Sequence, residues 1–200
     1  MLIVNNLIVM AAPLKWSEFQ EILDLVKRDA TKDKDVGLYR FLIFATLSGY
    51  RGLLAGDVLK MTWGDVYKAT YPSFRGWLKR HPRKEDDILI EIAYRLAVKS
   101  LGENANSSND YGMNLSIMPP LKSDGTKPMS IQSLNRLLKD VFLHYGKPVQ
   151  MLSTHTFRKT YAKHIYEQKG KTTNALIQLS KELGHSSSSV TKKYIDINNG

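Results

Sequence analysis

Apolar residues recur at helical spacing along most of the chain. In residues 17–29 they lie three or four positions apart, and Ser17 followed by Gln20 forms a capping-box pattern. Residues 38–47 are densely apolar and predict a buried helix that ends near Gly49, where glycine permits the terminating backbone geometry. Ser130 is a suitable cap for a further helix that carries one apolar stripe to about His144.

Shorter helices are predicted between these segments and near the C-terminus, at residues 57–61, 93–101, 155–168 and 173–183. Residues 63–65 are expected to form a turn, and residues 102–112 a polar loop. The four serines at 186–189 are interpreted as a helix cap and turn. A nucleophilic serine would need a base and a residue that orients the base, and no such set accompanies these serines.

The pattern changes over residues 67–92, where aromatic and β-branched residues flank a polar block at 79–87. This pattern predicts a small antiparallel ribbon with a basic turn. The expected fold is therefore mainly α with a small antiparallel β-sheet, an α+β class. Residues 1–16 are interpreted as an N-terminal arm and residues 17–200 as one domain.

Residues 1–14 are apolar, but they lack a basic start and are too short to span a bilayer. They predict a buried strand or arm in a cytoplasmic protein without a membrane partner. The chain has no cysteine, which excludes a disulfide frame, a thiolate zinc site and a cysteine nucleophile.

The charge of this 200-residue chain limits the classes of partner that it is expected to bind. Lys and Arg number 29 against 19 acidic residues, which gives a net charge of +10, and 42% of residues are hydrophobic, enough for one core. Half of the excess lies in residues 151–200, where eight basic residues face three acidic ones. This balance favours a polyanion such as nucleic acid, or an anionic membrane surface.

Three local patterns suggest chemistry. The segment HTFRKTYAKH places His155 and Arg158 one turn apart on one helix face. The segment LGHSSSSVTKKY places His185 after a glycine and Tyr194 nine residues later. The segment LSGYRG places Arg51 directly after a buried helix.

This set of side chains suits a phosphodiester and requires no metal or cofactor. Two arginines can hold the non-bridging oxygens, since a guanidinium matches two phosphate oxygens. A tyrosine hydroxyl can attack phosphorus when a histidine accepts its proton. A lysine can protonate the departing deoxyribose oxygen. The phosphotyrosyl bond conserves the energy of the broken linkage, so rejoining needs no ATP.

Together the patterns resemble the catalytic domain of the tyrosine recombinase (phage integrase) family. That family has His-x-x-Arg, then Gly-His, then the nucleophilic Tyr. Upstream, LIFATLSGYR is similar to its apolar helix ending in Thr-Gly-Leu-Arg, and DVLKMTWGD to the segment before its Trp-x-Asp. Residues 118–140 also resemble the stretch before His-x-x-Arg. The resemblance runs from about residue 17 to the end and implies the family's DNA breaking-rejoining fold.

The resemblance implies a role for each matched residue. Tyr194 is the nucleophile, Arg51 and Arg158 clamp the phosphate, His155 accepts a proton and His185 donates a hydrogen bond. The family's general-acid lysine lies in the turn of the small sheet; Lys84 is preferred over Lys79 because it directly precedes the returning strand. Contacts with the DNA backbone are expected from Lys79, Arg83, Lys159, Lys192 and Lys193. The expected partners are double-stranded DNA and further copies of the chain, as a tetramer on DNA.

Three features depart from the family pattern. An acidic residue usually follows the first Arg by three, whereas Asp57 follows Arg51 by six, and a register fixed by Asp57 puts Leu54 at the Arg position. Residues 1–16 are too few for the DNA-clamping domain that usually precedes the catalytic one. Six residues follow Tyr194, too few for the helix that many relatives pass to a neighbouring subunit.

Two alternatives to an active recombinase stay open. One is a degenerate recombinase that binds DNA as a regulator without cutting it. The other is a type IB topoisomerase, against which the short length and the Gly-His motif count. Taken alone, Tyr194 is better explained as a packing residue. Its position after Gly-His favours the role of nucleophile.

Overall fold

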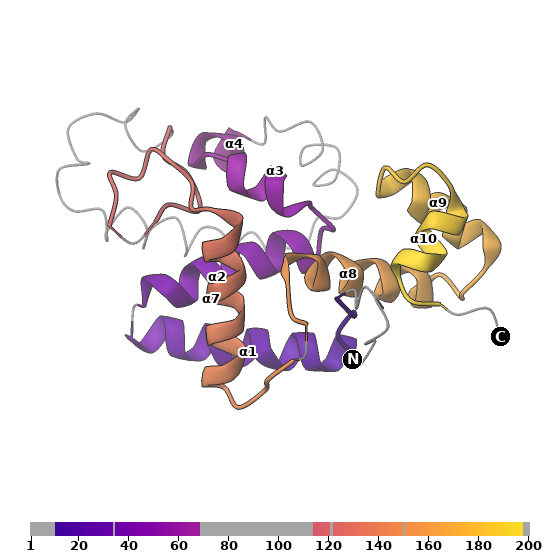
Figure 1. The fold of residues 1–200 in the computed structure, drawn as a ribbon, viewed down its shortest axis with the longest axis horizontal. Helices are drawn as coiled ribbons and strands as arrows, with labels where there is room; N and C mark the ends of the chain where they lie inside the picture. The colour runs from indigo at the N-terminus through magenta and orange to yellow at the C-terminus, as the bar shows by residue number, and fades with distance from the viewer. Residues whose placement is uncertain (1–10, 34, 69–113, 121, 150, 198–200) are drawn as a thin grey trace, which may run out of the picture.

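The computed structural model describes residues 11–33, 35–68, 114–120, 122–149 and 151–197. Within these ranges the chain forms helices α1 (Trp16–Asp33), α2 (Val36–Gly49), α3 (Ala55–Lys60), α4 (Trp63–Lys68), α7 (Ile131–His144), α8 (Thr154–Gln168), α9 (Thr173–Glu182) and α10 (Ser188–Tyr194) (Figure 1). The helices predicted in this part of the chain are confirmed. The helix and the loop predicted at 93–101 and 102–112 lie outside the described residues.

The helix starts follow from short polar side chains. Asp35 caps α2 by accepting hydrogen bonds from the backbone N–H groups of Gly37 and Leu38. Ser130 caps α7 as predicted, through the N–H of Ser133. Helix α1 begins one residue earlier than expected, at Trp16.

The prediction of a small antiparallel sheet was wrong. In the part of the chain that the structure describes there is no strand, and the single β-bridge, between Thr62 and Ser116, is isolated. Tyr67 and Lys68, the expected start of the ribbon, belong to helix α4. Residues 69–92 of the expected ribbon lie outside the described residues.

The predicted turn at residues 63–65 is likewise the first turn of α4. Thr62 and Asp65 form a reciprocal cap: Asp65 Oδ2 accepts the N–H of Thr62 at 2.9 Å, and Thr62 Oγ1 accepts the N–H of Asp65 at 3.2 Å. Such a capping box satisfies backbone donors at a helix start and favours the helix over a turn.

The main core lies between α1, α2, α7 and the first half of α8. Phe157 of α8 is fully buried at its centre, and its ring packs edge-on against those of Phe41, Phe44 and Phe142, with centroids 5.5–6.2 Å apart. Aromatic rings prefer such tilted contacts, which add to the free energy gained by burying them. This packing fixes the N-terminal half of α8.

A second, smaller core lies at the other end of α8. Tyr161 and Ala162 of α8 pack there with Leu179 of α9 and with Ile195, the residue after α10. Figure 1 shows α9 and α10 gathered at this end, away from α1, α2 and α7. Helix α8 thus contributes residues to both cores. Its residues between Phe157 and Tyr161 lie where the two cores meet.

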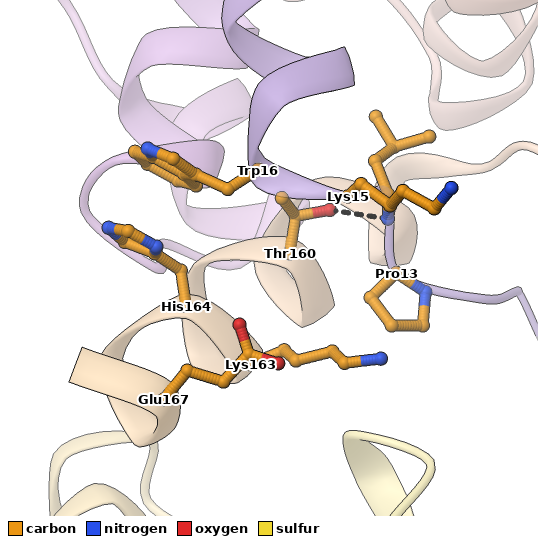
Figure 2. Close-up of a pocket in the computed structure, with 8 residues that line it drawn as sticks. Pro13, Lys15, Trp16, Thr160, Lys163, His164 and Glu167 are labelled. Carbon is orange, nitrogen blue, oxygen red and sulfur yellow. Dashed lines mark hydrogen bonds between the residues drawn. The ribbon is translucent and has the colours of Figure 1, made fainter. Parts of the chain in front are cut away.

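The N-terminal entry to α1 crosses the middle of α8. The N–H of Leu14 donates to Thr160 Oγ1 at 2.9 Å, and the ring of Trp16 stacks on His164 with centroids 3.6 Å apart (Figure 2). Beside this contact lies an open pocket of about 180 Å³ that Lys163 also lines. Of the predicted arm, residues 11–16 are described; Leu14 is buried, whereas Ala12 and Lys15 are exposed.

None of the helices in the described ranges is both long enough and apolar enough to cross a membrane.

Candidate active site

Arg158 lies at the junction of the two cores, one turn into α8, and only 8% of the residue is exposed. Its Nη1 donates to the carbonyl oxygen of Gly52 at 2.8 Å, and its Nη2 to that of Leu183 at 2.6 Å. The two acceptors lie in the loops that follow α2 and α9. One buried guanidinium therefore ties three separate segments together.

Arg51 lies in the turn after α2 and is 3% exposed. The next residue, Gly52, has φ +66° and presents its carbonyl oxygen to Arg158, so the backbone at Arg51 lies against the second arginine. Leu54, the alternative occupant of the first arginine position, is 43% exposed and directly precedes α3. The structure thus brings the segment of Arg51 to Arg158.

His185 and Tyr194 lie in contact. Their rings meet edge to face, with centroids 4.9 Å apart and an interplanar angle of 72°. The Nδ1 of His185 shares a 2.9 Å hydrogen bond with the hydroxyl of Thr191, which is fully buried on α10. Gly184, with φ +68°, ends α9 and turns the chain so that His185 faces α10.

The charge of Arg158 acts on both rings. Burial lowers the pKa of His185, and the positive charge of Arg158 lowers it further. Burial raises the pKa of the Tyr194 phenol, and Arg158 partly opposes this effect. Burial lowers the pKa of Arg158 itself, while Tyr194 and Asp57 raise it. Both the imidazole and the phenol are therefore held towards their neutral forms.

The hydroxyl oxygen of Tyr194 is buried, although the residue as a whole is half-buried. Arg158 is close enough to lower the pKa of this phenol, yet no hydrogen bond of normal geometry reaches the oxygen from any other described residue. A buried hydroxyl that lacks a well-formed hydrogen bond is energetically costly, and Arg158 is the described group that acts on it.

The other predicted site residues differ in their exposure to solvent. His155, in the first turn of α8, is exposed, and its ring makes no hydrogen bond to other residues that the structure describes. Lys193 is exposed and Lys192 half-buried, both in the last turn of α10. Lys159 is only 2% exposed, which argues against its predicted contact with DNA. Lys79, Arg83 and Lys84 lie outside the described residues.

Sequence reasoning missed several groups that shape the site. The carbonyl oxygens of Gly52 and Leu183 carry no sequence signature, because every residue has one. Thr191 could have been considered, since it lies six positions after His185 and three before Tyr194. Its hydroxyl orients the imidazole, and only the fold of α10 reveals that role.

Comparison with known proteins gives one partial likeness. No protein-family model matches the chain. A stretch of 71 residues is 35% identical to the probable integrase/recombinase YoeC of Bacillus subtilis (strain 168). The similar stretch covers 36% of this chain and 36% of that protein, so the chain spans about a third of the length of the relative that it matches.

Proposed function

We propose that the chain cleaves and rejoins DNA strands as a site-specific recombinase of the tyrosine type, with Tyr194 as nucleophile. The observation that carries this proposal is the meeting of Arg158, His185 and Tyr194 where α8 packs beside α9 and α10. The likeness to a probable integrase/recombinase supports it independently of the geometry. The partner is double-stranded DNA; assembly into a tetramer on DNA stays a prediction.

In the proposed reaction the phenol oxygen of Tyr194 attacks a phosphorus atom of the DNA backbone. A bond forms between that oxygen and phosphorus, the bond to the 5′ oxygen breaks, and the 5′ oxygen leaves with a proton. The product is a 3′-phosphotyrosine and a free 5′ hydroxyl. Rejoining is the reverse step, so one phosphodiester is exchanged for another and no ATP is needed.

Arg158 and Arg51 act on the negative charge that grows on the phosphate. Each terminal nitrogen of Arg158 uses one N–H on a backbone carbonyl and has a second N–H for a ligand. A guanidinium already fixed by the protein needs no reorganisation when the transition-state charge develops. His185 is held through Nδ1 by Thr191, which leaves Nε2 as the nitrogen that can meet a phosphate oxygen.

Proton transfer needs groups beyond these. Because burial raises the pKa of Tyr194, its phenol is neutral near pH 7 and needs a base before it attacks. We assign this role to His155 on the resemblance to the family's His-x-x-Arg motif; its ring is exposed on the first turn of α8, so the phenol must be uncovered before the two groups can meet. Lys84, outside the described residues, is assigned as the general acid for the leaving 5′ oxygen.

A second candidate function is DNA binding and regulation without cleavage. The covered hydroxyl of Tyr194 favours it, since an oxygen that no solvent reaches cannot meet a phosphate in this arrangement. Cleavage requires that the segment around α10 move enough to uncover this oxygen. The two functions therefore differ in one measurable event, the formation of a covalent adduct.

The test is a nicked suicide duplex. Duplexes that bind the protein are selected from a randomised pool, rebuilt with a nick next to each candidate cleavage point, and incubated with the protein. We expect a protein–DNA adduct that survives denaturing electrophoresis. Tyr194→Phe should abolish the adduct and retain DNA binding. Tyr166→Phe is the matched control, because the Tyr166 hydroxyl bonds the carbonyl of Lys171 away from the site.

An adduct that persists in Tyr194→Phe would show that another residue is the nucleophile. Tight, sequence-selective binding without any adduct from the wild-type protein would support the regulatory function instead.

A further inference from the structure

Lys159 occupies an unusual position for a lysine. Its side chain is 3% exposed, whereas lysine is almost never fully buried unless a counterion accompanies it. The counterion is Asp196: the ammonium nitrogen lies 3.3 Å from Oδ1 and 3.5 Å from Oδ2. Lys159 directly follows Arg158 on α8, so this ion pair adjoins the candidate active site.

The same ammonium group also contacts the nucleophile. Its nitrogen lies 5.4 Å from the centroid of the Tyr194 ring, within range of a cation–π interaction. Lys159 thus binds the ring of Tyr194 and the carboxylate two residues later. Two contacts from one buried group restrict both the ring and the chain that follows it.

The chain after α10 is shaped to make this ion pair. The N–H of Asp196 donates to the carbonyl oxygen of Lys193, and Asp196 has φ +54°, in the left-handed region that side chains other than glycine rarely adopt. Ile195, just before it, is fully buried in the second core. The backbone therefore reverses at Asp196 while the buried neighbour anchors it, and the carboxylate meets α8.

We propose that Lys159 is a positioning residue for Tyr194, acting through its ion pair with Asp196. The pair holds the end of α10 against α8 and sets where the phenol lies relative to Arg158. This inference rests on the proposed function, since a position matters only if Tyr194 reacts. The hold on α10 can nevertheless be measured without DNA.

The first measurement is backbone hydrogen exchange of residues 190–197 in the free protein. Lys159→Met removes the charge and keeps a long apolar side chain, and Asp196→Asn removes the partner. We expect each to accelerate exchange in this segment about tenfold, and the double variant to exchange no faster than the single ones, because both remove the same interaction. Lys159→Arg, which keeps the charge, should restore slow exchange.

The second measurement is adduct formation on the suicide duplex. We expect Lys159→Met and Asp196→Asn to lower the rate at saturating DNA about tenfold while the dissociation constant for DNA stays unchanged, and Lys159→Arg to recover much of the rate. Lys163→Met, on the same helix beside the pocket in Figure 2, is the control and should match the wild type.

Each outcome is decisive. Exchange that is unchanged in both Lys159→Met and Asp196→Asn would overturn the proposal, as would faster exchange with an unchanged adduct rate. Faster adduct formation would overturn it too, because the pair would then restrain Tyr194 rather than position it. If the wild-type protein forms no adduct, the proposed function fails, and the exchange result still reports whether the pair holds α10. Asp196→Asn alters a partly exposed side chain, so it provides the test if Lys159→Met does not fold.

Discussion

The Nη1 atom of Arg158 donates a hydrogen bond of 2.8 Å to the carbonyl oxygen of Gly52, a residue 106 positions earlier in the chain. Through Nη2 the same guanidinium binds the carbonyl oxygen of Leu183 at 2.6 Å. Arg51 precedes the first acceptor by one residue, and His185 follows the second by two. The two bonds therefore set the relative positions of the segments that carry the candidate site.

Arg158→Lys tests this bridging role. A lysine ammonium cannot reach two carbonyl oxygens in the planar geometry of a guanidinium, so at least one buried acceptor loses its partner. We expect a loss of about 2–3 kcal/mol in the free energy of unfolding, measured by urea denaturation. Arg136→Lys, at an exposed position of α7, is the control. Equal stability of the two variants would mean that the bonds of Arg158 contribute little.

Gly52→Ala tests the close approach between Gly52, whose carbonyl oxygen accepts the hydrogen bond from Arg158, and the ring of Tyr161. Gly52 has φ +66°, and an added Cβ would lie 2.5 Å from Cδ1 of Tyr161. Gly146 has nearly the same φ, +65°, with no atom within 4 Å of its Cβ position. Both variants incur about 1 kcal/mol for the left-handed backbone. We expect Gly52→Ala to have a lower thermal unfolding temperature than Gly146→Ala. Similar decreases in the two variants would show that the Tyr161 ring can move away from the added Cβ without loss of stability.

Local patterns predicted the helices well because helix periodicity and caps are local properties. Ser130 caps α7 as the sequence indicated. Residues 63–65 form a helix rather than the expected turn because Thr62 and Asp65 cap each other's backbone N–H groups at the start of α4. The sheet prediction failed at Tyr67 and Lys68, the described part of the expected ribbon, because these residues continue helix α4 and strand composition without pairing does not form a strand.

Part of the geometry of the candidate site was predictable from the sequence, and the burial of its charged groups was not. The spacing of His185 and Tyr194 predicted a common site, and their rings are in contact. No periodicity indicated that Lys159, next to Arg158, is buried against Asp196 rather than exposed. Burial of a charged group depends on a partner far along the chain, which a single sequence does not reveal.

The pKa of His185 provides a pH-dependent test. Burial and the charge of Arg158 lower this pKa below the ordinary value of about 6.5. Between the two values the unfolded chain binds more protons than the folded one, so stability rises with pH there and is lost as pH falls through the folded pKa. We expect NMR titration to give a value below 6.5, with His185→Gln identifying the signal. The unfolding free energy of this variant should also depend less steeply on pH between 5 and 7. A measured His185 pKa at or above 6.5 would contradict the burial of its ring.

Arg51→Ala tests which residue fills the first arginine position. If Arg51 stabilises the transition-state charge, its loss should slow adduct formation on the suicide duplex by roughly two to three orders of magnitude. Leu54→Ala, at an exposed position three residues later, should leave the rate near that of the wild type. Circular dichroism must show that Arg51→Ala is folded, because the side chain is buried. Near-normal cleavage by a folded Arg51→Ala would remove this residue from the site.

The lysines at the end of α10 should contact DNA phosphates. Each phosphate contact releases about one counterion, so the logarithm of the binding constant falls with the logarithm of salt concentration in proportion to the number of contacts. We expect Lys192→Ala and Lys193→Ala each to reduce that slope by about one on a duplex of random sequence. Lys139→Ala changes an exposed lysine of α7, away from α10 in Figure 1, and should leave the slope unaltered. If all three variants keep the wild-type slope, DNA binds a different face, and the covered hydroxyl of Tyr194 would then lie away from the bound duplex.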